Sequence, residues 1–323
     1  MIAPARLPPP AGPGDRVGVA ALSGPVEPER LERGLAALEG MGFRPVVADN
    51  VRLRSRTGLF AGTDAERLAG FHRLAADPEV AAVFFARGGH GALRVLPGID
   101  WDLLARRPRA YVGYSDLTPF LLAAVRRLGV VAFHGPMAAA DLARGLPPED
   151  EASLLAALAG AYPVTQPLAA PVRASGPGAS GLLLGGCLSL LAATLGTPYA
   201  PDLAGALLFW EDVGEPAYRI DRMLTHLRLS GSLAGLQGMI VGHLNGGDAA
   251  QIAPPDELRI ASGMASGAGG RDGVYREVVA DALAGLPWPI AWGQPSGHRP
   301  PNRTLPLGLP ARLSPAASEW VLG

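Results

Sequence analysis

Residues 80–91 read VAAVFFARGGHG, an unbroken apolar run followed by a loop with three glycines. A short run of Val, Ala and Phe without polar interruption predicts a strand that is buried on both faces of its sheet. Strands of that kind belong to parallel sheets that are covered by helices. The segment therefore predicts an α/β fold, with a glycine-rich loop at the carboxyl end of a central strand.

The neighbouring segments repeat this alternation of strands and helices. Further strands are expected at 17–22, 45–48, 110–113 and 130–133, with helices at 31–41, from 63 onward behind a capping box, and at 119–128. The order predicts a flavodoxin-like parallel sheet with helices on both faces. The second half is more mixed, with helices expected at 187–195 and 218–229 and strands at 206–210 and 239–243. Near its end, short strand candidates at 289–292, 304–307 and 311–313 are separated by Gly and Pro. We expect an N-terminal α/β domain at 1–160, a linker at 161–178 and a smaller β-rich domain at 179–323.

The composition excludes several kinds of function. A formal net charge of -1 and the absence of basic runs argue against a nucleic-acid or anionic membrane partner. Residues 1–14 are Pro-rich and lack a signal-peptide core, and no apolar window is long enough to span a bilayer, so a cytoplasmic location is expected. The chain has no lysine, which excludes Schiff-base and Ser–Lys chemistry. Its single cysteine, Cys187, excludes an intrachain disulfide and a Cys-rich zinc site.

One serine lies where a buried strand gives way to a helix, in the sequence Gly113-Tyr114-Ser115-Asp116. A sharp turn at that point would lift the Ser115 hydroxyl clear of the sheet and place the next backbone N–H beside it. The carboxyl ends of strands are also where open α/β sheets bind ligands. The alternative is that Ser115 or Asp116 only caps the following helix.

The glycine-rich loop at 87–91 is a candidate anion site. Consecutive glycines let backbone N–H groups converge on an oxyanion without obstruction by side chains. Gly88 and Gly89 are the candidate donors. A tight turn without a ligand is the alternative, and the glycine spacing does not match a dinucleotide fingerprint.

A nucleophilic serine needs a base and an orienting carboxylate. Of the six histidines, His298 lies in a loop that has no structural need for imidazole, while His134 and His243 each end a strand and stay open as candidates. Glu211 ends an apolar strand and could orient the base. Alternatively, it begins the next helix and complements the helix dipole.

Several segments, in order, resemble the LD-carboxypeptidases, a serine peptidase family that includes murein tetrapeptide carboxypeptidases and microcin-immunity peptidases. The segments are RGGHG at 87–91, GYSDLT at 113–118, FHGPM at 133–137, GGCLSL at 185–190, GTP at 196–198, LFWEDVGE at 208–215, YRIDRM at 218–223, GH at 297–298 and LPLG at 305–308. Two departures are His90, where the family usually has Tyr, and Cys187, where it usually has Asn.

The resemblance implies a Ser–Glu–His triad, which corresponds here to Ser115 as nucleophile, Glu211 as orienting carboxylate and His298 as base. It also implies an oxyanion hole from the amides of Gly88 or Gly89 together with Asp116. His90 and Tyr114 are expected to contact substrate. The triad would then draw its nucleophile from the first domain and its other two members from the second.

The implied substrate is a small muropeptide, from which the enzyme would release the terminal D-alanine during cell-wall recycling. A homodimer is a further expectation from the resemblance, and neither a cofactor nor a metal is expected. Hydrolysis of an aminoacyl or peptidyl nucleotide, as in the microcin-immunity branch, is the alternative reaction. A noncatalytic ligand-binding protein of the same fold is the alternative from another class. A nucleotide-cofactor enzyme is disfavoured because no phosphate-binding motif is present.

Overall fold

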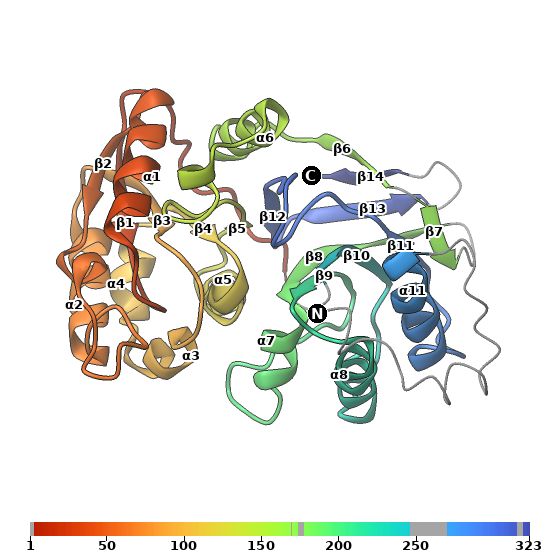
Figure 1. Ribbon diagram of the computed structural model, residues 1–323. Coiled ribbons are helices and arrows are strands. Elements are labelled where there is room, and N and C mark those ends of the chain that lie inside the picture. The colour runs from red at the N-terminus through yellow and green to blue at the C-terminus, as the bar shows by residue number, and fades with distance from the viewer. Residues whose placement is uncertain (1–2, 169, 174–177, 246–269, 315–318) are drawn as a thin grey trace.

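The computed structural model describes residues 3–168, 170–173, 178–245, 270–314 and 319–323 and contains two sheets, which lie side by side in Figure 1. The first sheet has the strand order β12-β5-β4-β3-β1-β2. Its strands and the helices of the first half are β1 (Arg16–Ala20), α1 (Pro28–Gly40), β2 (Arg44–Val47), α2 (Asp64–Ala76), β3 (Val80–Phe85), α3 (Ala92–Val95), α4 (Trp101–Arg106), β4 (Ala110–Gly113), α5 (Thr118–Leu128), β5 (Ala132–His134) and α6 (Pro148–Leu158), with β12 (Leu305–Leu307) added from the C-terminal region.

Strands β1 to β5 are parallel, which confirms the expected α/β fold. Residue Thr63 caps α2 through the predicted capping box with Glu66. Four short 3-10 helices complete this half: η1 (Asp49–Arg52), η2 (Leu96–Gly98), η3 (Ser115–Leu117) and η4 (Leu142–Arg144). The helix α5 ends at Gly129 in the left-handed conformation that glycine adopts without strain.

The second sheet is mixed, with the order β6-β14-β13-β8-β9-β10-β11-β7. Its strands β8, β9, β10 and β11 are parallel, and the remaining pairs are antiparallel. The elements are β6 (Val164–Pro167), β7 (Ala170–Arg173), β8 (Ala179–Cys187), α7 (Leu188–Ala193), β9 (Ala206–Val213), α8 (Ala217–Leu229), β10 (Gly238–Asn245), α11 (Gly270–Ala282), β11 (Ile290–Trp292), β13 (Pro310–Ser314) and β14 (Glu319–Leu322). A β-rich second region is therefore present, as expected.

The segment 161–178, which the sequence predicts as a linker, contributes two strands to this sheet. Strand β6 pairs with β14 at one edge, and β7 pairs with β11 at the other. Both carry proline, which edge strands tolerate because one side of the strand needs no ladder hydrogen bond. The partners that make these residues strands are distant in sequence, so local composition alone predicted a loop.

An aromatic cluster holds the strands that carry the site. The rings of Phe71, Phe85, Tyr111 and Phe120 lie with centroids 5.2–6.1 Å apart, between α2, β3, β4 and α5. All four are almost fully buried. Dense packing of this kind fixes the ends of β3 and β4 relative to each other, and those ends bear the glycine loop and Ser115.

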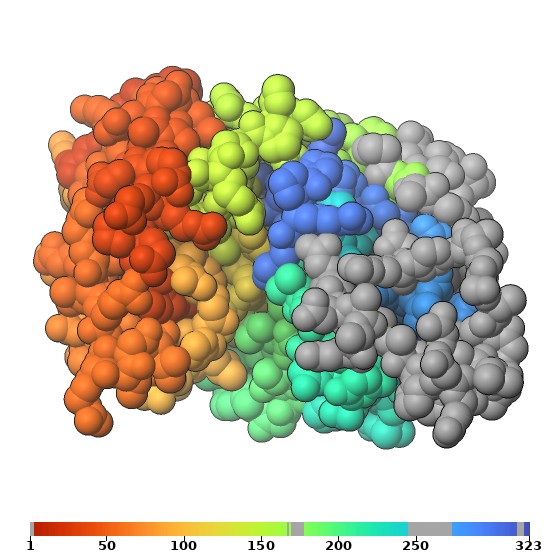
Figure 2. Space-filling model, in the orientation of Figure 1, coloured from red at the N-terminus to blue at the C-terminus, as the bar shows by residue number. Residues whose placement is uncertain are grey.

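The two sheets meet at the end of β8. The backbone N–H of Cys187 donates to Thr118 Oγ1 at 3.0 Å, just beyond the Ser115 turn. A Cβ on Gly186 would lie 2.5 Å from the same oxygen, so this close approach requires glycine. Helix α6 bridges the two halves at another point, and Figure 2 shows it in yellow-green between the orange N-terminal and blue C-terminal parts. Within the described residues, no helix has the length and apolar character to cross a membrane.

Candidate active site

Ser115 lies in a strained turn between β4 and α5. Its φ is 62°, and among the described residues it is the one non-glycine residue with a positive φ. An L-residue with a side chain adopts that region at an energetic cost, and such strain is concentrated at functional sites. Neither Ser115 nor Tyr114 caps the helix through its side chain. The turn has the geometry of a nucleophile elbow.

Asp116 anchors this turn and does not cap the helix α5 that follows it. Its Oδ2 accepts hydrogen bonds from the Ser23 hydroxyl at 2.6 Å and from the Ala92 backbone N–H at 2.8 Å. Asp116 is 3% exposed, so both bonds are shielded from water. They connect the ends of β1, the glycine-rich loop and the serine turn. The Ser23 contact joins residues 93 positions apart, and no sequence pattern signalled it.

His298 lies between Ser115 and Glu211. Its Nε2 is 2.9 Å from Ser115 Oγ, and its Nδ1 is 2.6 Å from Glu211 Oε2. A carboxylate can only accept, so Nδ1 carries the proton and Nε2 of the neutral ring is left to accept from the serine O–H. The structure thus brings together all three residues that the resemblance implied as a triad.

Glu211 is fully buried at the end of β9, and its environment leaves no space for larger neighbours. A Cβ on Gly297 would lie 2.8 Å from Glu211 Oε2, and one on Gly242 would lie 3.1 Å from its Cβ. Gly297 also has a φ of 132°, which favours glycine. The alternative interpretation of Glu211 as a helix-dipole partner is wrong, because its side chain hydrogen-bonds His298.

The electrostatics of the site increase the basicity of His298. Burial by itself lowers the His298 pKa, but the charge of Glu211 and its hydrogen bond outweigh burial, so the pKa is raised above its ordinary value. An orienting carboxylate of this kind stabilises the imidazolium that forms when the ring takes a proton. The imidazole is therefore a stronger base than a free histidine.

Asp212, next to Glu211, serves a different purpose. Its Oδ2 accepts from the Ser189 N–H at 2.7 Å, which ties the start of α7 to the end of β9. Burial, followed by repulsion from Glu211, raises the Asp212 pKa to about 6. Burial also raises the pKa of the nearby Cys187 thiol well above its usual range, so that cysteine is unsuited to act as a thiolate.

The other two candidate histidines lie elsewhere. His134 is fully buried between Tyr114 and Phe209, and burial lowers its pKa to about 3, so it is neutral. His243 hydrogen-bonds the Pro301 carbonyl through Nε2 at 2.9 Å and accepts from Arg299 Nε at 3.1 Å. Both bonds support the loop that carries His298, so His243 contributes to its position.

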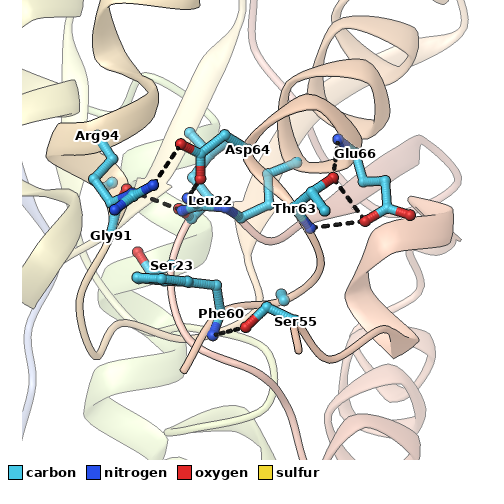
Figure 3. A network of polar contacts seen from close by, with 12 residues as sticks. Leu22, Ser23, Ser55, Phe60, Thr63, Asp64, Glu66, Gly91 and Arg94 are labelled. Atoms are coloured by element: carbon cyan, nitrogen blue, oxygen red, sulfur yellow. Dashed lines mark hydrogen bonds and ion pairs between the residues drawn. The ribbon is translucent and has the colours of Figure 1, made fainter. Parts of the chain in front are cut away.

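The glycine-rich loop is held in place by a buried arginine. Arg67, which is 0% exposed, donates to the carbonyls of Leu22 and Gly91 and to Asp64. Figure 3 shows Leu22, Asp64 and Gly91, which accept these bonds, together with the ion pair between Arg94 and Asp64. An arginine has several donors in a fixed plane, so a single side chain can tie the loop to the end of β1 and to α2.

Gly88 and the nucleophile are in direct contact. A Cβ on Gly88 would lie 2.9 Å from Ser115 Cβ, 3.0 Å from its Oγ and 3.5 Å from the Asp116 nitrogen. Gly89 lies instead against Gly24. As the second residue of η3, Asp116 has an N–H with no partner inside that helix. Of the predicted oxyanion donors, Gly88 and Asp116 therefore border the serine directly.

The two expected substrate contacts differ in their surroundings. Tyr114 is buried, with its ring 4.9 Å from that of His298 and its hydroxyl donating to Asp141 Oδ1 at 3.2 Å. It therefore supports the imidazole. His90 is exposed and packs edge-on against Phe60, with ring centroids 5.3 Å apart. The resemblance alone could not separate these two roles.

A serine in a strained turn, an imidazole and a buried carboxylate, hydrogen-bonded in that order, define the site of a serine hydrolase. No group of His, Cys, Asp or Glu side chains in the described part of the chain is arranged to hold a metal ion.

Comparison with known proteins identifies the family. Residues 17–135 match the LD-carboxypeptidase N-terminal domain, and residues 180–313 match the LD-carboxypeptidase C-terminal domain. A Streptomyces coelicolor protein named "Putative carboxypeptidase" is 41% identical, over 97% of this chain and 93% of the relative. The murein tetrapeptide carboxypeptidase of Pseudomonas aeruginosa is 32% identical over 94% and 95%.

A solved structure agrees with these matches. The muramoyltetrapeptide carboxypeptidase from Oxalobacter formigenes superposes with a TM-score of 0.79 at 29% identity, covering 95% of this chain and 97% of that one. The chain belongs to the LD-carboxypeptidase family of serine-type hydrolases.

Proposed function

We propose that the protein is a serine carboxypeptidase that hydrolyses an LD-amide bond, releasing the terminal D-alanine of a murein tetrapeptide in cell-wall recycling. The observation that carries the proposal is the continuous chain of hydrogen bonds from Ser115 through His298 to Glu211, at 2.9 and 2.6 Å. Relatives named for murein peptides, at 32% and 29% identity over nearly the whole chain, support the choice of substrate.

In the proposed mechanism, His298 Nε2 takes the Ser115 proton as Oγ attacks the scissile carbonyl carbon. Glu211 stabilises the resulting imidazolium, because its carboxylate already accepts the Nδ1 proton. The N–H groups of Gly88 and Asp116 hold the oxyanion. His298 then protonates the leaving D-alanine nitrogen, and a water, activated by the same imidazole, hydrolyses the acyl-enzyme.

The two halves of the chain must be docked for this reaction. Ser115 follows β4 of the first sheet, whereas Glu211 lies near the end of β9 and His298 follows β11, both in the second sheet. Thr118 and Cys187 help to hold the two halves in register. Their 3.0 Å hydrogen bond joins the start of α5 to the end of β8. A homodimeric, cytoplasmic enzyme remains our expectation.

The test is mass spectrometry of murein tetrapeptide incubated with wild-type protein, with Ser115→Ala and with Ser232→Ala as a matched control at a half-buried turn residue after α8. We expect loss of one D-alanine with the wild type and the control only. Cleavage by Ser115→Ala at the wild-type rate would remove Ser115 from the mechanism. If no variant cleaves tetrapeptide, aminoacyl sulfamoyl adenylates become the substrates to test. Failure of Ser115 to react with any serine-directed acylating probe would favour the noncatalytic ligand-binding alternative.

A further inference from the structure

A further buried carboxylate, that of Asp141, lies close to the triad. Asp141 precedes η4 and is 5% exposed, and its side chain makes no capping bond to that short helix. Its Oδ1 accepts from the Tyr114 hydroxyl at 3.2 Å and from Arg144 Nη2 at 2.6 Å, and its Oδ2 accepts from the Met137 N–H at 3.1 Å. Three donors from different positions therefore hold the carboxylate in one orientation.

The segment that carries Asp141 is attached firmly to the first half of the molecule. The Ala139 N–H donates to the carbonyl of Ala86, directly after β3, at 2.8 Å. A Cβ on Gly34 of α1 would overlap the Ala138 carbonyl oxygen, so the helix covers this segment at the closest possible distance. Asp141 therefore has a fixed position relative to the strand ends that bear the site.

Tyr114 connects this carboxylate to the proposed base. Its ring lies 4.9 Å from the His298 ring at an interplanar angle of 70°, an arrangement that aromatic pairs favour. His298 bonds Ser115 and Glu211 through its two ring nitrogens, so these bonds leave the imidazole able to rock about the line that joins those nitrogens. The Tyr114 ring restricts that motion, and its hydroxyl bond to Asp141 in turn restricts the Tyr114 ring.

Asp141 also adds to the negative charge around the imidazole. Burial lowers the His298 pKa, whereas the charges of Glu211, Asp212 and Asp141, in decreasing order, raise it, and the pKa is raised overall. Arg144 offsets part of the Asp141 charge, but its side chain is 43% exposed and is therefore partly screened by water. Further ionisable side chains near the imidazole are His134, which is neutral, and Arg299, which donates to His243.

We propose that Asp141 is a positioning residue for His298: it holds the Tyr114 ring against the imidazole, and its charge stabilises the imidazolium that forms during proton transfer. Arg144 limits how much of that charge acts on the imidazole. The inference rests on the proposed function, because it requires the triad to act. The alternative is a purely local role, in which Asp141 only fixes its own loop.

The test measures, as a function of pH, the rate at which a serine-directed phosphonofluoridate reacts with the full-length protein. In this reaction Ser115 Oγ bonds to phosphorus, its proton passes to His298 and fluoride leaves, so the rate reports on the base without a peptide substrate. Asp141→Asn keeps an acceptor oxygen for the Tyr114 hydroxyl but removes the charge. Because less negative charge lowers the His298 pKa, the pH midpoint of the rate should fall, by roughly 0.3–1, which is less than for a charge in direct contact.

Two other variants separate the charge from the ring contact. Arg144→Met leaves the Asp141 charge without its cation, so the midpoint should rise, by less than it falls in Asp141→Asn. Tyr114→Phe keeps the charge but loosens the ring, so the plateau rate should fall by roughly 3- to 10-fold while the midpoint does not fall. Asp102→Asn, at an exposed residue of α4, is the matched control and should leave the midpoint and the plateau rate unchanged.

Several results would overturn the proposal. An unmoved midpoint in Asp141→Asn, or a fall in both Asp141→Asn and Arg144→Met, would leave Asp141 with only the local role. A wild-type plateau rate in Tyr114→Phe would remove the ring contact. If thermal melts show that Asp141→Asn does not fold, Arg144→Met decides, and an unmoved or lowered midpoint refutes the proposal.

Failure of the proposed function gives a different result. A wild-type protein that reacts with the phosphonofluoridate but releases no D-alanine from murein tetrapeptide would refute the substrate, while the midpoints would still decide the role of Asp141. A wild-type protein whose Ser115 does not react at all would refute both.

Discussion

Replacing Gly88 with alanine should abolish most of the activity while leaving the protein folded. Gly88 has a φ outside the left-handed region, so alanine is permitted by its backbone. The added Cβ would nevertheless lie 2.9 Å from Ser115 Cβ and 3.0 Å from Ser115 Oγ. Carbon atoms prefer separations of about 3.5–4.0 Å, so the serine or the loop must move by roughly 0.5–1 Å.

A displacement of that size acts on two parts of the proposed mechanism. It moves the Ser115 oxygen relative to His298 Nε2, and it places a methyl group beside the Asp116 N–H, where the oxyanion would bind. A misplacement of about 1 Å costs on the order of 10²-fold in rate, and loss of one oxyanion donor costs about 10²–10³-fold. We expect kcat/KM to fall by about 10²–10³.

The assay is release of D-alanine from murein tetrapeptide, with the rate of Ser115 phosphonylation by a serine-directed phosphonofluoridate, which releases fluoride, as a second readout. Gly12→Ala is the control, because a Cβ at Gly12 meets no atom within 4 Å. A native thermal melt for both variants would show that any loss is local. If Gly88→Ala retained the wild-type kcat/KM and phosphonylation rate, the assignment of Gly88 to the oxyanion site would be refuted.

Two further predictions concern the base and the loop support. Because the reaction needs neutral His298, whose pKa is raised chiefly by Glu211 against the opposing effect of burial, activity should fall as the pH drops through that raised pKa. In Glu211→Gln the pH–rate midpoint should shift to lower pH while kcat falls about 10³–10⁴-fold, and an unshifted midpoint would contradict this account. Arg67→Leu removes the side-chain donor from the buried Leu22 carbonyl and one of two donors from the Gly91 carbonyl, which keeps the Arg94 N–H. The variant should lower the free energy of unfolding by about 1–3 kcal/mol in urea denaturation. Arg73→Leu on the exposed face of α2 should change it by less than about 1 kcal/mol, and equal effects would refute the anchoring role.

The fold could be predicted in part because the relevant signals are local. The unbroken apolar run at 80–86 and the other short apolar runs of the first half indicated buried parallel strands. The Thr63 capping box indicated where α2 begins. The segment 161–178 was predicted incorrectly as a linker because β6 and β7 become strands only through partners more than a hundred residues away. A proline-rich segment that pairs with a distant strand need not show the alternating apolar and polar pattern from which strands are predicted.

The sequence by itself determined the α/β class, the position of the nucleophile turn and, through its resemblance, the three residues of the proposed triad. Tertiary structure alone decided that Ser115, His298 and Glu211 form one hydrogen-bonded chain, that His134 is a neutral core residue, and that Asp116 ties Ser23 to the glycine loop. The physical reason is distance along the chain. Propensity and periodicity are encoded in neighbouring residues, whereas these contacts join positions 87 to 183 residues apart that meet only after both sheets have formed.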